Sequence, residues 1–373
     1  MTCPRRCDIS YVRIRPAMVE KVLVAMSGGV DSAAAALLLK RQGHDVVGVT
    51  LRLYDSRRPA GRSCCSPTAV KEAAALARRV GIPHYVLDFR QEFRRLVVDD
   101  FLAEYARGRT PNPCVRCNSL IKFDSLLRRA RATGFDAVAT GHYVNRAYDE
   151  NKGQYVLRRA VDAAKDQSYF VWGTPRQHLP ALLFPLGPFV KNDVRTLLSE
   201  VAEVAARKPE SQDICFVEDG PYADFIEGAT EGGGKAGPIV DEEGRFLGRH
   251  AGVARYTVGQ RRGLGVARGT RVYVKEIDAA TNTIVLAEAP ALAAAAFKAA
   301  AVNWIIPPAA EIRARVMVRY RDPGAAATLR RLADETWAVT FDEPRRAVAP
   351  GQSAAFYDGD TLLGGGVIDE VLT

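Results

Sequence analysis

The stretch KVLVAMSGGVDSAAAALLLK, residues 21–40, contains a polar turn with two glycines between two apolar runs. The first run, residues 21–26, has the length and composition of a buried strand, and the second predicts a helix over Ser32–Gln42. Gly28 and Gly29 let backbone amides approach an anion without a Cβ in the way, and the helix dipole favours negative charge at this end. The stretch therefore predicts a strand, a phosphate-binding turn and a helix.

The turn SGGVDS lacks the lysine of the P-loop GxxxxGK[ST], which contacts the β- and γ-phosphates of a nucleotide. Ser27 and Ser32 supply hydroxyl donors instead, and Asp31 is an acid that can hold Mg²⁺ or the turn itself. A glycine turn alone often does no more than join a strand to a helix. Because the whole string stands between a strand and a helix, we expect a nucleotide site of a different kind from an ordinary NTP-hydrolysing P-loop.

Strand-like and helix-like runs alternate from residue 21 to about residue 207, which predicts βαβ units and a parallel sheet. Ser66 before Pro67 is a typical helix start. Ligands of open parallel sheets bind at the carboxyl ends of strands, where both SGGVDS and TGHY fall. The expected strands are 21–26, 45–54, 83–89 and 135–140, the expected helices are 32–42, 67–79, 91–107, 117–131, 175–182 and 191–206, and a hairpin is expected over 146–160.

The composition changes after this α/β region. Residues 208–270 are rich in glycine and charge and predict a small, turn-rich middle domain. From about residue 271 short alternating runs such as RVYVKEI, TIVLAE and WAVTFD are separated by turns, which indicates an all-β barrel or sandwich. We therefore divide the chain into a disordered extension, a nucleotide-binding catalytic domain, a small central domain and a β-barrel, over residues 1–17, 18–207, 208–274 and 275–373.

The chain has a net charge of +9, which suits a polyanionic partner such as a nucleic acid. No apolar run approaches the roughly 20 residues that span a bilayer, so we expect a cytoplasmic protein without a membrane partner. Its seven cysteines are an odd number without a secretory segment, which argues against a disulfide scaffold. We assign no chemical role to four of the cysteines, which are Cys3, Cys7, Cys64 and Cys65.

The remaining three cysteines lie in two polar, loop-like contexts. Cys114 and Cys117 form a CxxC motif where a helix is expected to begin, and a thiolate is favoured at such a position. Arg109 and Arg116 add positive charge nearby. Cys215 lies far along the chain, in SQDICF. Thiol chemistry and metal or cluster binding both fit this set, while a chance CxxC and a buried apolar Cys215 are the plainer alternatives.

SGGVDS is the signature of the PP-loop ATP pyrophosphatases, which split ATP between its α- and β-phosphates. Eight segments stand in one order along the chain: SGGVDS, GRTPNPCVRCN, IKFD, ATGHY, KDQSYF, SQDICF, YTVGQRRGLG and GQSAAFYDGD…LGGG. From about Met18 onward the chain therefore resembles the tRNA-specific 2-thiouridylase family. This resemblance implies a parallel-sheet domain like the adenine nucleotide alpha hydrolases, a central domain and a C-terminal barrel. It also implies an ATP-dependent transferase that places sulfur on the wobble uridine of tRNA.

The resemblance implies roles for individual residues. ATP adenylates O2 of the uracil, Cys215 carries a persulfide, and Cys117 is the second, nucleophilic thiol. The residues implied at ATP are Ala25, Met26, Ser27, Gly28, Gly29, Val30, Asp31, Ser32, Leu51 and Gly141. Those implied at the target base are Asn112, Pro113 and Cys114, and those implied at the tRNA are Lys165, Asp166, Gln167, Arg319 and Tyr320.

Two mechanisms of sulfur transfer fit the sequence: a persulfide relay and an iron–sulfur cluster. Cys114, Cys117 and Cys215 can hold a [4Fe–4S] cluster with one open iron that binds sulfide. Some family members have Asp where this chain has Cys114, and we favour the persulfide relay. The expected partners are the anticodon arm of tRNA and a sulfur-donor protein, the expected cofactors are ATP and Mg²⁺, and we expect a monomer.

Three rival functions fit parts of the pattern. A PP-loop ligase or amidotransferase for a small molecule shares SGGVDS but has no need of Cys117 and Cys215. An RNA-binding module with a vestigial nucleotide site is the non-enzymatic rival. A lysidine synthetase or a 4-thiouridine synthetase is the third; the cysteine pair disfavours the former, and the β-rich C-terminus disfavours the latter.

Overall fold

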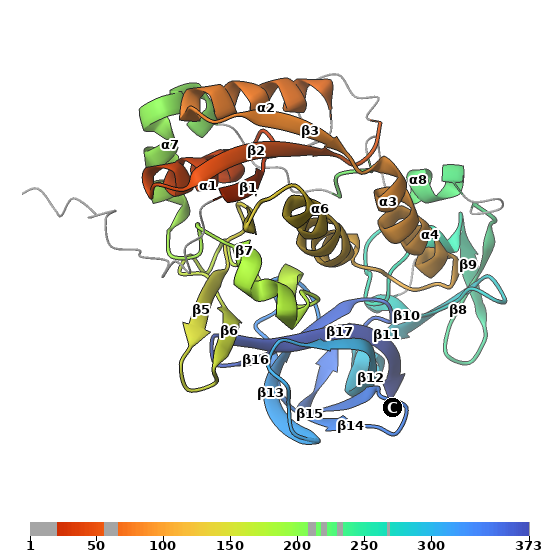
Figure 1. The fold of residues 1–373 in the computed structure, drawn as a ribbon. Helices are drawn as coiled ribbons and strands as arrows, with labels where there is room; N and C mark the ends of the chain where they lie inside the picture. The colour runs from red at the N-terminus through yellow and green to blue at the C-terminus, as the bar shows by residue number, and fades with distance from the viewer. Residues whose placement is uncertain are drawn as a thin grey trace, which may run out of the picture.

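The computed structural model describes residues 21–55, 66–207, 214–217, 222–229, 234–266 and 269–372. The expectations for residues 1–17, Cys3, Cys7, Cys64 and Cys65 lie outside these described residues. Within them the strands form three sheets, and a parallel sheet, a small middle sheet and a barrel follow one another along the chain (Figure 1). The expected fold class is confirmed.

The first sheet is parallel and has the strand order β3-β2-β1-β4-β7. The chain starts in the middle at β1, goes outward through β2 and β3, and then returns to the other side of β1 with β4. The order therefore reverses between β1 and β4, and ligands of such sheets bind where this happens. The strands are β1 (Lys21–Ala25), β2 (Asp45–Arg52), β3 (His84–Asp88), β4 (Ala137–Ala139) and β7 (Leu182–Leu183).

Helices cover both faces of this sheet (Figure 1). Val22 and Val24 of β1 pack on one side, against α1 (Val30–Arg41), α2 (Pro67–Val80) and α7 (Lys191–Ala206). Leu23 points to the opposite side, as alternation along a strand requires. The helical segments on that side are α3 (Arg90–Phe93), η2 (Arg94–Val98), α4 (Asp99–Ala106), α5 (Pro113–Arg116), η3 (Cys117–Ser125) and α6 (Leu126–Ala132).

The start of α2 follows the sequence prediction. The Oγ of Ser66 accepts a hydrogen bond of 3.1 Å from the backbone N–H of Ala69, and Pro67 is the first helical residue. The helix ends at Gly81, whose φ of +78° is the left-handed conformation that favours glycine.

Three helical predictions need correction. The helices expected over 91–107 and 117–131 are present, but η2 and η3 within them are π-helical, a winding that a search for a 3.6-residue period does not detect. The helix expected over 175–182 is wrong. This stretch forms the 3₁₀ helix η5 (Arg176–Ala181), which contains Pro180, and then the two-residue strand β7. A two-residue strand is too short to show any periodicity.

The C-terminal strands form a closed antiparallel barrel. Six strands follow the order β12-β15-β14-β13-β16-β17, and β17 pairs again with β12, which closes the ring. The predicted hairpin adds to the edge of β17 by pairing with it through β6. The strands are β5 (Asn145–Asp149), β6 (Gln154–Arg158), β12 (Ala293–Trp304), β13 (Glu311–Met317), β14 (Ala325–Arg331), β15 (Trp337–Arg346), β16 (Ser353–Asp358) and β17 (Thr361–Leu372).

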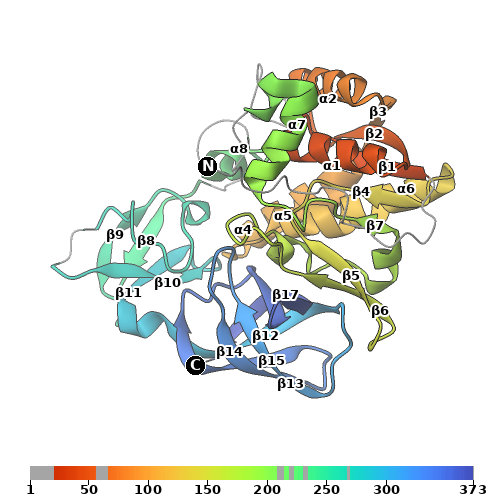
Figure 2. The same ribbon diagram turned by 90° about the vertical axis from the view of Figure 1, so that its left-hand side faces the viewer.

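A four-stranded sheet of order β10-β11-β8-β9 stands apart from the barrel (Figure 2). Its strands are β8 (Gly237–Val240), β9 (Phe246–His250), β10 (Val272–Asp278) and β11 (Thr283–Glu288), and the helix α8 (Tyr222–Ala229) precedes them. We expected β10 and β11 in the barrel region, but β10 pairs with β11, and β11 pairs with β8. The division into residues 18–207, 208–274 and 275–373 stays a proposal, and because residue 274 lies inside β10, the topology favours a last boundary after β11.

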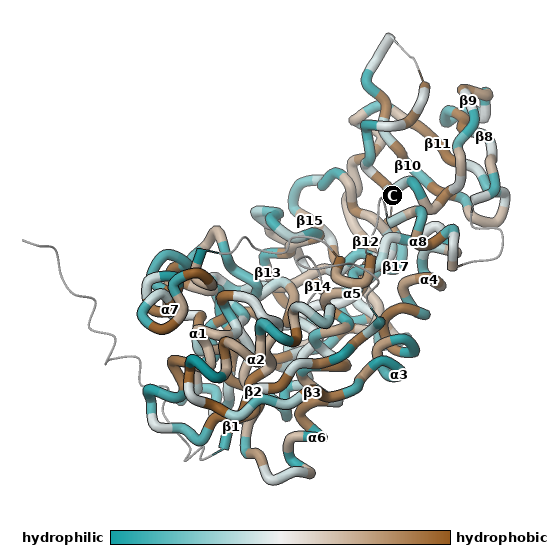
Figure 3. The backbone as a smooth tube through the Cα atoms, turned by 90° about the horizontal axis from the view of Figure 1, so that it is seen from above, coloured by the Kyte–Doolittle hydropathy of each residue, from teal (hydrophilic) through white to brown (hydrophobic). Residues whose placement is uncertain are grey.

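Short 3₁₀ helices complete the described chain. They are η4 (Ser168–Val171), η6 (Val253–Arg255) and η7 (Ala289–Leu292). Hydrophobic and hydrophilic stretches alternate along the chain trace (Figure 3). None of the helices in the described ranges is long and apolar enough to cross a membrane.

The barrel packs directly on the α/β domain. The Tyr169 hydroxyl donates to the Ser353 carbonyl at 2.8 Å, and the Asn303 Nδ2 donates to the carbonyls of Trp172 and Thr174 at 2.7 and 2.9 Å. Trp172 also lies against the backbone of β17, where a Cβ on Gly365 would come within 2.5 Å of its ring. These contacts fix the position of the barrel against the first domain.

The contact between Trp172 and β17 gives a test of this interface. We expect Gly365→Ala to destabilise the protein by about 1–3 kcal/mol, because neither the Trp172 ring nor the Ala354 carbonyl can yield cheaply. Thermal unfolding measures this as a lowered melting temperature. Gly269→Ala is the matched control, since no described atom lies within 4 Å of an added Cβ there. Equal melting temperatures for the two variants would contradict the packing described here.

Candidate functional site

The SGGVDS turn joins β1 to α1 with its backbone folded tightly. Gly28 has a φ of +77°, and a Cβ there would lie 2.8 Å from the Ala69 carbonyl of α2, so only glycine fits. The N-cap of α1 is Gly29, which offers no side chain to the first amides of the helix. The Ser27 N–H donates to the Ser32 Oγ at 3.2 Å, and this hydroxyl donates to the Gly29 carbonyl. The turn is therefore held by its own atoms, as an anion-binding turn requires.

A cavity of about 230 Å³ lies beside this turn. Seven of the ten residues expected at ATP line it, while Gly28, Gly29 and Val30 belong to the turn but do not line the cavity. Gly141 after β4 packs so closely on the turn that an added Cβ would lie 2.7 Å from the Asp31 carbonyl carbon. The lining residues are Ala25, Met26, Ser27, Asp31, Ser32, Thr50, Leu51, Leu53, Lys122, Thr140, Gly141, His142 and Gln167.

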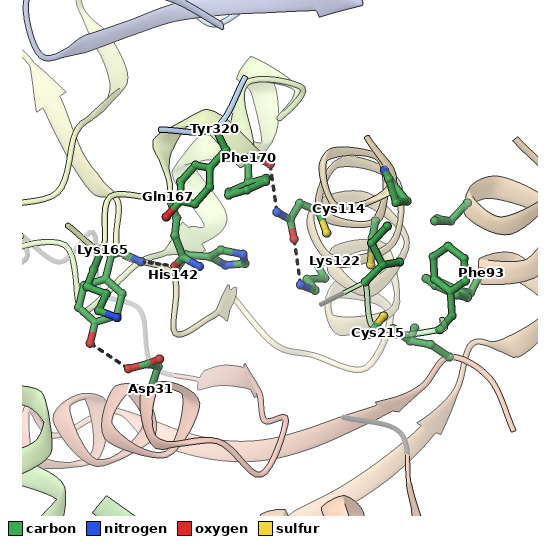
Figure 4. Close-up of a pocket in the computed structure, with 18 of the residues that line it drawn as sticks. Asp31, Phe93, Cys114, Lys122, His142, Lys165, Gln167, Phe170, Cys215 and Tyr320 are labelled. Carbon is green, nitrogen blue, oxygen red and sulfur yellow. Dashed lines mark hydrogen bonds between the residues drawn. The ribbon is translucent and has the colours of Figure 1, made fainter. Parts of the chain in front are cut away.

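A second cavity, of about 500 Å³, brings together three cysteines (Figure 4). Cys114 is exposed, Cys215 is half-buried, and Cys117 is buried with 8% exposure. Pro113 also lines this cavity. The expected tRNA contacts Lys165, Gln167 and Tyr320 line it as well, but Asn112, Asp166 and Arg319 do not.

The two cavities adjoin. Five residues line both of them: Asp31, Leu53, Lys122, His142 and Gln167. Gln167 bridges to the loop after β4, because its Oε1 accepts from the Tyr143 N–H at 2.9 Å and its own N–H donates to the Tyr143 carbonyl at 3.0 Å. The phosphate-type turn and the cysteines therefore face one continuous site.

Two of the residues expected to contact the tRNA or its target base make hydrogen bonds within the protein instead. The buried Asp166 carboxylate accepts hydrogen bonds from the Ser168 Oγ at 2.8 Å and the Ala160 N–H at 3.0 Å, and it pairs with Arg159. Asn112 caps the short helix α5, where its Oδ1 accepts from the Val115 N–H at 3.3 Å. Their side chains hold loops at the cavity edge.

A lysine that sequence reasoning missed lies at the turn. Lys191 is the first residue of α7, and its side chain is 8% exposed. Its Nζ lies 2.6 Å from the Asp31 Oδ1, which also accepts from the Tyr143 hydroxyl at 2.8 Å. A buried ammonium needs such a counter-charge. The turn without a lysine of its own thus has a cation beside it from 160 positions away, and no local pattern indicates this.

The segment that holds Cys215 is fixed by its neighbour. Phe216 is buried among three other rings, with edge-to-face contacts to Phe93, Phe101 and Phe225 at centroid distances of 5.6, 5.2 and 5.4 Å. The Tyr54 hydroxyl donates to the Cys215 carbonyl. In SQDICF a phenylalanine directly follows the cysteine. This large apolar residue in a polar segment could have predicted the buried anchor. Tyr320 and Phe170 form another aromatic contact at the cavity, with centroids 4.6 Å apart.

His142 is a neutral group at the junction of the cavities. Burial lowers its pKa well below the usual value, and the charge of Lys122 lowers it further. Its Nδ1 lies 2.7 Å from the Thr140 Oγ1, and its ring packs edge-to-face on Phe123 at 5.7 Å. A neutral imidazole at pH 7 follows from this environment.

The described part of the chain contains no group of three His, Cys, Asp or Glu side chains arranged to hold a metal ion. Cys114, Cys117 and Cys215 line one cavity, but they do not form such a group. A [4Fe–4S] cluster on three thiolates therefore has no support among the described residues.

Three family models match almost the whole chain. Residues 20–219 match a tRNA methyl transferase HUP domain, residues 223–288 a tRNA methyl transferase PRC-barrel domain, and residues 294–368 an aminomethyltransferase beta-barrel domain.

Proteins named tRNA-specific 2-thiouridylase MnmA are similar to this chain over nearly its full length. One from Moorella thermoacetica is 46% identical over 356 residues, which are 94% of this chain and 99% of that protein. One from Geotalea uraniireducens is 45% identical and covers 95% of this chain and 96% of its own. One from Clostridioides difficile is 42% identical, with coverages of 95% and 99%.

The buried, neutral His142 predicts a measurable sensitivity to acid. Its native pKa lies below the unfolded value of about 6.5, so the unfolded chain takes up a proton that the native protein does not bind. The free energy of unfolding should therefore fall as the pH drops below about 6.5, by up to about 1.4 kcal/mol per pH unit for this proton. We expect melting temperatures at pH 7.5 and 5.5 to differ less in His142→Gln than in the unchanged protein. An identical pH dependence in both proteins would exclude a neutral native His142.

Proposed function

The chain belongs to the tRNA-specific 2-thiouridylase family, and on that premise we propose that it uses ATP to replace O2 of a tRNA uridine by sulfur. It is a tRNA sulfurtransferase, and its uridine is the one at the wobble position. The matching family model bears a methyl transferase description, but the full-length relatives are named for thiolation. Thiolation also makes use of two thiols beside a nucleotide turn.

The observation that supports this proposal is the continuity of the two cavities. The SGGVDS turn lines the first, Cys117 and Cys215 line the second, and five residues belong to both. The two cysteines come from segments 98 positions apart. A ligase for a small molecule needs the first cavity and no pair of thiols in the second, and it is not favoured.

The first step activates the uracil. O2 attacks the α-phosphorus of ATP, the bond between the α- and β-phosphates breaks, and pyrophosphate leaves with the electron pair. O2 of a uracil is a poor leaving group, whereas AMP is a good one. The first amides of α1 and the SGGVDS turn bind the pyrophosphate, and Lys191 adds positive charge close to it.

The second step delivers sulfur. The terminal sulfur of a Cys215 persulfide attacks C2, the bond between C2 and O2 breaks, and AMP leaves with the oxygen. The Cys117 thiolate then attacks the inner sulfur of Cys215. The sulfur–sulfur bond breaks, the transferred sulfur stays on C2 as the thiocarbonyl, and a disulfide joins Cys117 to Cys215. A thiol reductant and a sulfur-donor protein restore the persulfide before the next turnover.

Mg²⁺ fits the nucleotide cavity. Asp31 is the one acid among its described lining residues, and Mg²⁺ is usually held by one or two carboxylates together with substrate phosphates. Asp31 would hold the ion, which neutralises phosphate charge. The proposed relay has no step through a [4Fe–4S] cluster, which no group of described residues supports.

The tRNA offers its anticodon arm to the larger cavity. A wobble base must leave its stack to reach a recessed site, and unstacked RNA bases bind well on aromatic rings. Phe170 and Tyr320 supply such rings, and Arg321 lines the cavity beside them. The net charge of +9 suits the phosphates of the arm. The monomeric state and the cytoplasmic location stay proposals.

Replacing either proposed thiol separates the two steps. We expect Cys117→Ser and Cys215→Ser to abolish 2-thiouridine, because a hydroxyl neither carries a persulfide nor opens one. Both variants should still release pyrophosphate from ATP when unmodified tRNA is added, since the first step uses neither thiol. Mass spectrometry of the tRNA nucleosides and a pyrophosphate assay measure the two outcomes. A variant that still forms 2-thiouridine would remove that cysteine from the mechanism.

Cys114→Ser distinguishes the relay from the cluster, because Cys114 lines the same cavity, belongs to the CxxC motif of Cys117 and is expected at the target base. No sulfur passes through Cys114 in the relay, so with a persulfide donor this variant should form 2-thiouridine more slowly, through a weakened base contact, and not lose it. Complete loss in this variant, together with iron bound to the unchanged protein, would favour the three-thiolate cluster instead.

A further inference from the structure

The junction of the two cavities has one positively charged side chain among its described residues. Asp31, Leu53, Lys122, His142 and Gln167 line both cavities. Asp31 is an acid, Leu53 and Gln167 are uncharged, and burial keeps His142 neutral. Lys122 therefore provides the positive charge at the place where the nucleotide cavity meets the thiol cavity. Figure 4 draws it between His142 and the cysteines.

The π-helical winding of η3 explains how Lys122 reaches the junction. Lys122 follows Cys117 by five residues, and both lie in η3. In an α-helix five residues turn the chain by about 500°, which places the two side chains on different sides. A π-helix bonds residue i to residue i+5, so residues five apart lie roughly one turn apart on the same side. Cys117 and Lys122 accordingly line the same cavity.

Lys122 is held in this place by a buried amide. Its Nζ donates to the Asn118 Oδ1 at 2.9 Å, and the Nδ2 of Asn118 donates to the Phe170 carbonyl at 3.0 Å. Asn118 is only 3% exposed. The charge of Lys122 lies close enough to His142 to contribute to the lowering of its pKa. The ammonium is thus oriented before any ligand arrives, which is the condition for effective electrostatic stabilisation.

The uridine adenylate must cross this junction. Its adenosine belongs to the cavity at SGGVDS and its uracil to the cavity at the cysteines, so the single phosphate that joins them lies where the cavities meet. On the premise of the proposed function, we propose that Lys122 binds the α-phosphate of the adenylate and stabilises AMP as it leaves. When sulfur adds to C2 and the bond to O2 breaks, the electron pair stays on the AMP oxygen. The Lys122 ammonium lies beside this growing negative charge.

Binding of AMP and of adenosine tests the contact without any turnover. The two ligands differ by the phosphate alone. We expect Lys122→Met to raise the Kd for AMP about 10- to 100-fold, the loss typical of a hydrogen bond to a charged group, while the Kd for adenosine changes little. Lys122→Gln keeps a donor for Asn118 and should show the same selective loss. Lys122→Arg keeps the charge and should restore much of the AMP affinity.

Lys298→Met is the matched control. Lys298 pairs with Asp334 at 2.6 Å on the barrel and lines neither cavity. This variant should bind both ligands as the unchanged protein does. Melting curves of all four variants exclude a general loss of fold. Equal weakening of AMP and adenosine in Lys122→Met and Lys122→Gln, or no weakening of either, would overturn the proposal.

The chemistry gives a second readout. With tRNA and a persulfide donor, Lys122→Met should form 2-thiouridine about 10²- to 10³-fold more slowly, as when a single stabilising donor is removed from an active site. Lys122→Arg should recover part of this rate. If the unchanged protein forms no 2-thiouridine, the proposed function fails, while the ratio of the Kd values still decides whether Lys122 holds a phosphate.

Discussion

The parallel pairing of β1 with β4 is the constraint on which the site depends. Because the strand order reverses there, the loops after both strands meet at one edge of the sheet. Gly141 lets the second loop lie directly on the backbone of Asp31 and Ser32, where a side chain would collide. The nucleotide cavity is the space that this contact leaves open. Lys122 of η3 lines this cavity, and Lys191 of α7 pairs with Asp31 at its edge; both add charge to a shape that the sheet has already determined.

Lys191 and Lys122 each have a polar partner at the site. Lys191 is buried and paired with Asp31, and Lys122 is oriented by an uncharged amide. The paired lysine can stay charged in a buried place because its counter-charge stays with it. A site built in this way is charged enough to bind phosphates and does not depend on a general excess of basic residues.

The sequence predicted the sheet, the barrel and the phosphate-type turn, because each has a local pattern. A strand before a glycine turn and a helix after it can be recognised within twenty residues, and so can Ser66 before Pro67. The position of Lys191 cannot, since nothing near it in the sequence refers to Asp31. The π-helical winding that turns Lys122 toward Cys117 also left no signal, because the apolar spacing of residues 117–131 fits an ordinary helix. Strands β10 and β11 were assigned to the barrel because alternation reveals a strand but not its partner.

The exposure of the three cysteines bears on the direction of the proposed sulfur relay. Cys215 is half-buried at the cavity, whereas Cys117 is buried within a helix that belongs to the core. A thiol that receives sulfur from another protein must be reached from outside, and a thiol that resolves the persulfide must be kept from reacting early. The half-exposed Cys215 meets the first condition and the buried Cys117 meets the second. The buried ring of Phe216 would hold Cys215 at the cavity that Cys117 also lines.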